Sequence, residues 1–201
     1  MYPEPIKKIS KILSDFPGIG PRQAIRIAFY LANQGKHLAE NLEDALEELQ
    51  QIKICKECFS SFEFSKGENG FCSICKDKSR KDNIIAILEK ETDLISLEKT
   101  KDFKGKYLVL GEISKDGILK GEQKLRLNSL KERLNNNQEK IEEIILAINP
   151  GTLGDIESSL LFAELKNFTH KISRLGRGLP TGGEIEFADD ETLKGALENR
   201  R

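Results

Sequence analysis

The stretch EIILAINPGTLGDIE, residues 143–157, decides the fold of this chain. It starts with a nearly continuous apolar run at 143–148, passes through an Asn-Pro-Gly turn, and enters a helical pattern at 155–166. Strands that are buried on both faces have such continuous runs, whereas half-exposed strands alternate apolar and polar residues. The stretch therefore predicts a strand and a helix of an α/β domain whose sheet is covered on both faces.

The same alternation extends in both directions from this stretch. Further strands are predicted at residues 84–88, 107–110 and 170–175, and further helices at 93–100, 122–134 and 190–199. Strands that alternate with helices favour a mostly parallel sheet. We expect an α/β domain over residues 81–175, followed at 176–201 by a C-terminal glycine-rich loop and helix. Arg174 and Arg177 belong to the glycine-rich stretch 174–184 at this boundary, where they could cradle a phosphate, contact a partner, or form part of a tight connection.

Residues 54–80 lack a regular period and contain all four cysteines of the chain. Cys55 and Cys58 form one C-x2-C pair, and Cys72 and Cys75 form a second pair after thirteen intervening residues. Two such pairs can supply four thiolates to one tetrahedral zinc ion, and four protein ligands leave it no open position. The pattern predicts one structural Zn²⁺ per chain. The alternative is two unrelated pairs of free or redox-active thiols.

The N-terminal region, residues 1–53, is predicted to hold three short helices. Apolar residues at spacings of three and four mark a first helix that ends at Pro17, and Pro21 suits the first position of a second. Asn41 is expected to cap a third helix that turns four apolar side chains inward: Leu42, Ala45, Leu46 and Leu49. The whole chain is therefore predicted to be an α+β multidomain protein.

The turn between the first two helices, FPGIGPR at residues 16–22, resembles a helix-hairpin-helix element. Gly18 and Gly20 would let the backbone approach a phosphate closely, and free N–H groups at the start of the second helix would bind it. Arg22 and Arg26 are four residues apart and share one helix face. These contacts predict DNA binding that is sensitive to salt and independent of base sequence. The alternative is a plain helical hairpin without a ligand.

The overall charge excludes binding to nucleic acid by the field of the whole molecule. Lys and Arg number 32 and Asp and Glu 33, so contact with polyanions requires a local basic patch. Residues 1–40 carry six basic and three acidic side chains, which concentrates basic charge around the hairpin. No apolar run approaches the roughly 20 residues of a membrane span. We expect a cytoplasmic, nucleoid-associated protein with reduced cysteines and no membrane contact.

Two segments of the α/β region resemble the acidic motifs of Toprim domains. In catalytic Toprim proteins, a glutamate and an Asp-x-Asp pair hold magnesium for phosphoryl transfer. This chain keeps Glu89 at the first position, but it has Asn149 and Gly151 in place of the two aspartates and Leu153 where a further glutamate would follow. No catalytic residue is predicted. Glu89 and Asp155 are candidates for a partner contact or for weak magnesium binding, although an Asp near a helix start is common without any metal.

Taken in order, four motifs resemble the RecR family of bacterial recombination mediators over nearly the whole chain. They are FPGIGPRQAIRIAFYL, the cysteine pairs ending in CSIC, AINPGTLGD and GRGLPTGGEIEFADDETL. Two features depart from the family: the loop between the cysteine pairs is longer than usual, and Leu153 with Asp155 replaces an acidic pair.

The resemblance implies a non-enzymatic accessory factor in the repair of DNA gaps and breaks. Such proteins act with RecO and/or RecF to promote loading of RecA onto single-stranded DNA, and they bind single-stranded, double-stranded and gapped DNA. They assemble as ring-like homotetramers or as dimers. A ring would gather several weak basic patches around one channel and so provide avidity.

Two other classes of function fit parts of the sequence. A Toprim nuclease or topoisomerase would change DNA length or linking number in the presence of a divalent metal. A zinc-bearing RNA-binding protein would prefer RNA to DNA, but it would leave the Toprim-like half unexplained.

Overall fold

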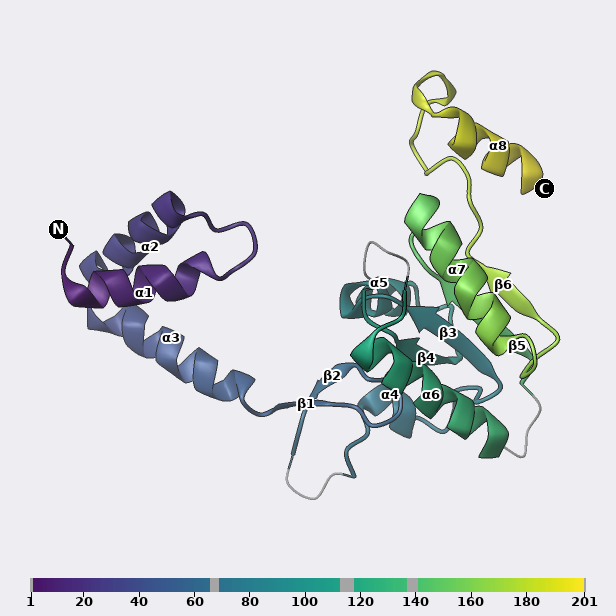
Figure 1. Ribbon diagram of the computed structural model, residues 1–201, viewed down its shortest axis with the longest axis horizontal. Coiled ribbons are helices and arrows are strands. Elements are labelled where there is room, and N and C mark those ends of the chain that lie inside the picture. Colours follow the sequence, from purple (N-terminus) through teal and green to yellow (C-terminus); the bar gives the residue numbers. More distant parts are fainter. Residues whose placement is uncertain (1, 66–68, 113–117, 137–140, 201) are drawn as a thin grey trace. The chain divides into compact units, whose positions relative to one another are not determined.

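The computed structural model describes residues 2–65, 69–112, 118–136 and 141–200 (Figure 1). The chain forms two compact units, Met1–Ile52 and Lys53–Arg201. The first unit is helical, and the second combines a parallel sheet with helices and the cysteine stretch, so the predicted α+β class is confirmed. The division into four domains, 1–53, 54–80, 81–175 and 176–201, stays a prediction.

The first unit contains α1 (Glu4–Ser14), α2 (Pro21–Asn33) and α3 (Lys36–Leu49). The predicted helices on either side of the Pro17–Pro21 turn are confirmed. They pack chiefly against each other, with Ile6 of α1 and Ala24 and Ala28 of α2 buried. The two alanines give close contact between the helices because their side chains are short.

The prediction for α3 was wrong in two respects. The helix begins at Lys36, after Gly35 with φ +77°, and Asn41 lies inside it with its Nδ2 2.8 Å from His37 Nδ1. A glycine that adopts a positive φ easily ends the preceding turn, so no Asn cap is needed. The apolar side chains are also not turned inward: Leu42, Leu46 and Leu49 are 41, 53 and 63% exposed, because α1 and α2 pack chiefly against each other and leave this face of α3 uncovered.

The second unit is built on a four-stranded sheet. Its strands are β3 (Ile84–Leu88), β4 (Lys106–Val109), β5 (Glu143–Ala147) and β6 (Ile172–Arg174), in the order β4-β3-β5-β6. All pairings between these strands are parallel, as predicted. The strand positions agree with the predicted ones within two residues at each end.

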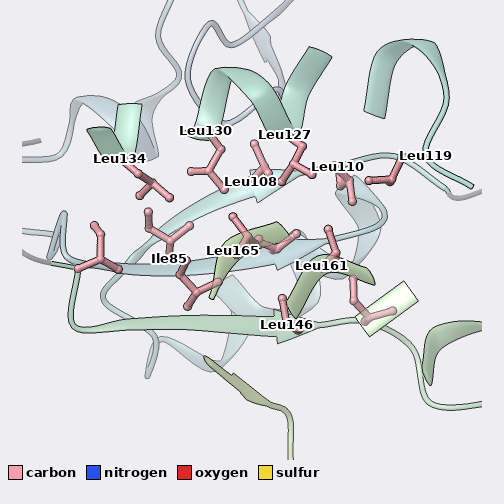
Figure 2. Packing of buried hydrophobic residues seen from close by; sticks show 14 residues of the cluster. Ile85, Leu108, Leu110, Leu119, Leu127, Leu130, Leu134, Leu146, Leu161 and Leu165 are labelled. Atoms are coloured by element: carbon pink, nitrogen blue, oxygen red, sulfur yellow. The ribbon is translucent and has the colours of Figure 1, made fainter. Parts of the chain in front are cut away.

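One face of the sheet packs against two helices, α6 (Gly121–Asn136) and α7 (Thr152–Leu165). Figure 2 shows side chains of this layer: Leu127 and Leu130 of α6, Leu161 and Leu165 of α7 and Ile85 of the sheet belong to one buried cluster. All five are at most 2% exposed, and full burial of one such side chain stabilises the fold by about 2 kcal/mol. α7 starts three residues before its predicted start, directly after Gly151.

The opposite face of the sheet packs against α5 (Glu91–Thr100) and against the cysteine stretch. Cys55, Cys58 and Cys72 are buried in one cluster with Tyr107 and Val109 of β4. The stretch also contains two short elements that its sequence did not predict, β2 (Ser61–Glu63) and α4 (Ser73–Lys76), and the short strand β1 (Ile52–Ile54) leads into it. The cysteine stretch is therefore part of the core of this unit.

The C-terminal segment ends in a short 3-10 helix, η1 (Ile185–Phe187), and α8 (Asp190–Glu198). Asp189 caps α8 by accepting a hydrogen bond from Thr192 N at 2.8 Å. Within the described ranges, no helix is long and apolar enough to cross a membrane.

A candidate metal centre and a candidate nucleic-acid interface

The four cysteines meet at one point. Their Sγ atoms all lie within 4.8 Å of one another, and those of Cys58 and Cys72 are 3.5 Å apart. A tetrahedral zinc site with bonds of about 2.3 Å places its sulfurs roughly 3.8 Å apart, which fits this cluster. The backbone N–H of Cys72 donates to Cys55 Sγ at 3.3 Å. Two turns distant in sequence thus deliver a donor set suited to Zn²⁺.

The thiols shift one another's pKa values in opposite directions. Hydrogen bonds, above all with Cys58, lower the pKa of Cys55, whereas the thiols of Cys55, Cys58 and Cys72 raise the pKa of Cys75. Four thiolates at this spacing repel one another, and a divalent cation at their centre offsets that repulsion. The electrostatics of the cluster therefore also suit a bound cation. Cys75 is half-buried, while the other three cysteines are buried.

The predicted DNA-binding residues lie together at the turn between α1 and α2. Gly18 has φ +82°, and a Cβ at Gly18 or Gly20 would meet no atom within 4 Å. Gly20 is the N-cap of α2, and no described side chain caps that end of the helix. Because Pro21 has no N–H, the amides of Arg22 and Gln23 are the ones left without an intrahelical acceptor.

The basic side chains of this helix are accessible. Arg22 and Arg26 are exposed, as are Gly18 and Gly20. Arginine side chains one helical turn apart, beside amides at a helix N-terminus, form an arrangement that can bind the phosphates of a nucleic acid.

The two Toprim-like acidic residues, Glu89 after β3 and Asp155 in the first turn of α7, are held by different partners. Glu89 follows β3, and its Oε2 accepts hydrogen bonds from Asn149 N at 3.2 Å and Asn149 Nδ2 at 2.8 Å. Asn149, which stands in place of an aspartate, thus supplies donors to Glu89.

Glu157 of α7 is a residue that the sequence analysis missed. It is 3% exposed, and its Oε1 has no hydrogen-bond partner among the described residues. Burial, together with the nearby charge of Glu89, raises the pKa of Glu157 to about 8. The signal was present in the sequence: Glu157 falls at the buried spacing of α7, shared with Gly154, Leu161 and Leu165.

Asp155 faces a different set of groups. Its Oδ1 accepts from Arg174 Nη1 at 2.5 Å and also from Arg177 Nη2. Hydrogen bonds with Arg174 and then Arg177 lower the pKa of Asp155. Arg177 in turn donates to Glu191 at 2.8 Å, which connects the glycine-rich loop to α8. Arg174 and Arg177 were expected to cradle a phosphate, contact a partner or form part of a tight connection. Their contacts with Asp155 and Glu191 favour the tight connection.

A cavity of about 550 Å³ opens at the carboxyl ends of the strands. It is lined in part by Leu88 and Arg174, the last residues of β3 and β6, by Asn149 and Pro150 after β5, and by Arg177 after β6. In open α/β sheets this edge is the usual place for ligands and partners.

Family models match three parts of the chain. The helix-hairpin-helix model of RecR matches residues 6–49, a Toprim domain model matches residues 83–176, and the C-terminal model of RecR matches residues 178–201.

Relatives match over the full length. The recombination protein RecR of Thermus thermophilus is 40% identical over 202 residues, which cover all of this chain and 98% of the relative. The recombination proteins RecR of Gloeobacter violaceus and Myxococcus xanthus are each 37% identical over 204 residues, covering all of this chain and 99% of the relative.

Proposed function

Because the chain belongs to the RecR family of recombination proteins, we propose that it is a non-enzymatic mediator of DNA repair that binds DNA through the α1–α2 turn. The observation that carries this proposal is the exposed, uncapped start of α2 beside two exposed arginines. Gly18 and Gly20 admit a phosphate, the amides of Arg22 and Gln23 donate to it, and Arg22 and Arg26 neutralise charge. Since these groups contact phosphates, we expect single-stranded, double-stranded and gapped DNA all to bind, without base specificity.

The Toprim-like edge supports a non-catalytic role. Two-metal phosphoryl transfer needs several carboxylates aimed at the cations. Asn149 donates to Glu89 here, and Asp155 is held by Arg174 and Arg177. We therefore propose that Glu89 and its surroundings contact a protein partner, RecO and/or RecF, in preference to magnesium.

The cysteine cluster is proposed to hold one structural Zn²⁺ per chain. Cys55, Cys58, Cys72 and Cys75 would be its ligands, and when bound the ion would offset the mutual repulsion of their thiolates. A closed set of four thiolates would stabilise the fold without providing an open site for chemistry.

Self-association into a homotetramer or dimer is supported by apolar surface in both units. Leu42, Leu46 and Leu49 are exposed on α3, and Ile185 and Phe187 are 68 and 80% exposed near the C-terminus. Exposed apolar side chains that cluster are typical of interaction surfaces. A closed tetramer with twofold axes needs two different self-complementary surfaces, which matches one patch in each unit.

A RecA-loading assay tests this function. Single-stranded DNA is covered with single-strand-binding protein, and RecA assembly is followed with and without this chain, in the presence of RecO, RecF or both. We expect faster RecA assembly only when this chain and a partner are both present. A Glu89→Gln variant should bind DNA normally but stimulate less. Unchanged RecA assembly with every partner combination would contradict the mediator proposal.

A further inference from the structure

Lys106 is a buried lysine whose contacts the proposed function does not explain. It lies in the edge strand β4, and its side chain is 4% exposed. Its Nζ donates to three backbone carbonyls, those of Ile74 at 3.1 Å, Cys75 at 3.0 Å and Asp77 at 3.0 Å. An ammonium group has three N–H donors, so all of them are directed at the turn that carries the second cysteine pair.

The first cysteine pair is attached to the same domain by other contacts. Val109 N of β4 donates to the carbonyl of Cys58 at 2.8 Å. Arg133 of α6 forms an ion pair with Glu57 at 3.0 Å, between the two cysteines of that pair. The second pair is attached in a similar way by Lys106 of β4. Both turns are thus fixed to the α/β domain by a donor from β4.

The charge of Lys106 suits this place. Burial of an ammonium group is unfavourable unless it is hydrogen-bonded and its charge is compensated. Asp82 offers partial compensation, with Oδ1 at 3.6 Å from Nζ. Four thiolates around one divalent cation leave about two net negative charges, which a nearby ammonium stabilises.

Among the four cysteines, Cys75 is the one whose position depends most on the contacts of Lys106. A cavity of about 490 Å³ is lined by Cys75, Lys106, Asp77 and Arg133, among others. The other three cysteines are buried, so this cavity gives solvent its access to the cluster through Cys75. The rate at which an ion is lost therefore depends on how firmly the turn of Cys75 is held.

We propose that Lys106 is a positioning residue of the metal site, which fixes the turn of Cys75 through its three carbonyl contacts and so retards release of the ion. This inference rests on the proposed zinc site. Groups that orient metal ligands from outside the coordination sphere typically alter metal affinity by about 10- to 100-fold when they are replaced.

The test measures zinc release to a coloured chelator at a temperature where circular dichroism shows every variant folded. Lys106→Met is compared with Lys131→Met, which removes a lysine of α6 that pairs with Glu164 of α7. We expect release from Lys106→Met to be at least about tenfold faster than from the wild type, by the same reasoning. Lys131→Met should release zinc at the wild-type rate, and Lys106→Arg, which keeps charge and donors, should recover part of the difference.

A second readout separates positioning from loss of general stability. With Co²⁺ in place of zinc, the ligand-field absorption should change in Lys106→Met and stay unchanged in Lys131→Met. If Lys106→Met does not fold, Lys106→Gln replaces it, because its amide keeps two donors without the charge. If folded Lys106→Met released zinc at the wild-type rate and had an unaltered Co²⁺ spectrum, the proposed role of Lys106 would be wrong, while the zinc site itself would stand. A wild-type protein that binds no zinc would overturn the zinc site as well.

Discussion

Asn149 donates two hydrogen bonds to a single oxygen of Glu89, from its backbone N at 3.2 Å and its Nδ2 at 2.8 Å. The two residues follow neighbouring parallel strands, where a catalytic Toprim protein has acids on both sides. A neutral amide that donates to the carboxylate satisfies Glu89 without a cation. The ends of β3 and β5 are thus joined by hydrogen bonds.

This relationship predicts the effect of restoring an acid. Asn149→Asp removes the Nδ2 donor and places a second carboxylate beside Glu89, so it should lower the free energy of unfolding by about 1 to 3 kcal/mol. In a chain of this size the melting temperature should fall by several degrees. Millimolar Mg²⁺ should restore part of the loss in Asn149→Asp and leave the wild type unchanged. If Mg²⁺ raised the melting temperature of the wild type as much as that of Asn149→Asp, the wild type would have a cation site at Glu89, and this prediction would be wrong.

Glu157 predicts a pH dependence of stability. Its pKa is raised to about 8, so its contribution to stability is complete below its ordinary value of about 4.3 and is lost as the pH rises through about 8. Glu157→Gln cannot lose a proton, so its free energy of unfolding should rise relative to that of the wild type between pH 5 and pH 8.5, by about 4 kcal/mol. Urea titrations at a series of pH values measure this. The control, Glu122→Gln on α6, should keep the wild-type pH profile, and parallel profiles for Glu157→Gln and wild type would refute the assignment.

Removal of a cysteine should cost both metal and stability. Cys58→Ser is expected to lower the zinc content from about one ion per chain to nearly none, because a structural site depends on all four ligands. Its melting temperature should fall by more than about 5 °C, and a chelator should bring the wild type to a similar value. Elemental analysis and calorimetry check both. Full stability of the wild type after complete removal of zinc would contradict a structural role.

The two apolar patches predict separable steps of assembly. Replacing Leu42, Leu46 and Leu49 by Gln should remove one self-interface, and Phe187→Ser should weaken the other. Each variant alone should reduce a tetramer to a dimer, and the combination should give a monomer, as measured by sedimentation velocity. A monomeric wild type at micromolar concentration, or variants identical to it, would exclude these surfaces as interfaces.

The sequence predicted those parts of the fold that periodicity determines. The apolar run Ile84–Leu88 became a buried strand because its side chains alternate between two covered faces, and the four cysteines met because the two C-x2-C pairs lie at one point of the fold. The α3 prediction failed since an amphipathic pattern shows which face is apolar but not what covers it. In this chain the face stays exposed.

Single polar residues inside the core were harder to predict. Glu157 and Lys106 are buried, and their roles depend on groups that are distant in sequence, such as Glu89 and the carbonyl of Cys75. Similarly, Asp155 was a candidate for metal binding, but its partners Arg174 and Arg177 come from the end of β6 and the loop after it, about twenty residues later. Local spacing can mark a residue as buried, as it does for Glu157, but it does not show which distant groups contact that residue.

The α1–α2 turn is proposed to bind DNA and to leave it intact. The direct test is fluorescence anisotropy with gapped and single-stranded DNA over a salt series, with and without Mg²⁺, followed by a denaturing gel. The double variant Arg22→Ala and Arg26→Ala should weaken DNA binding about tenfold or more. It should also reduce the slope of log K against log salt concentration by about 2 for each engaged chain. The control, Lys99→Ala with Lys166→Ala, removes the same charge from the other unit and should change DNA affinity little. The DNA should remain uncut. Equal binding by the arginine variant and the wild type, or cleavage that depends on Mg²⁺, would contradict this account.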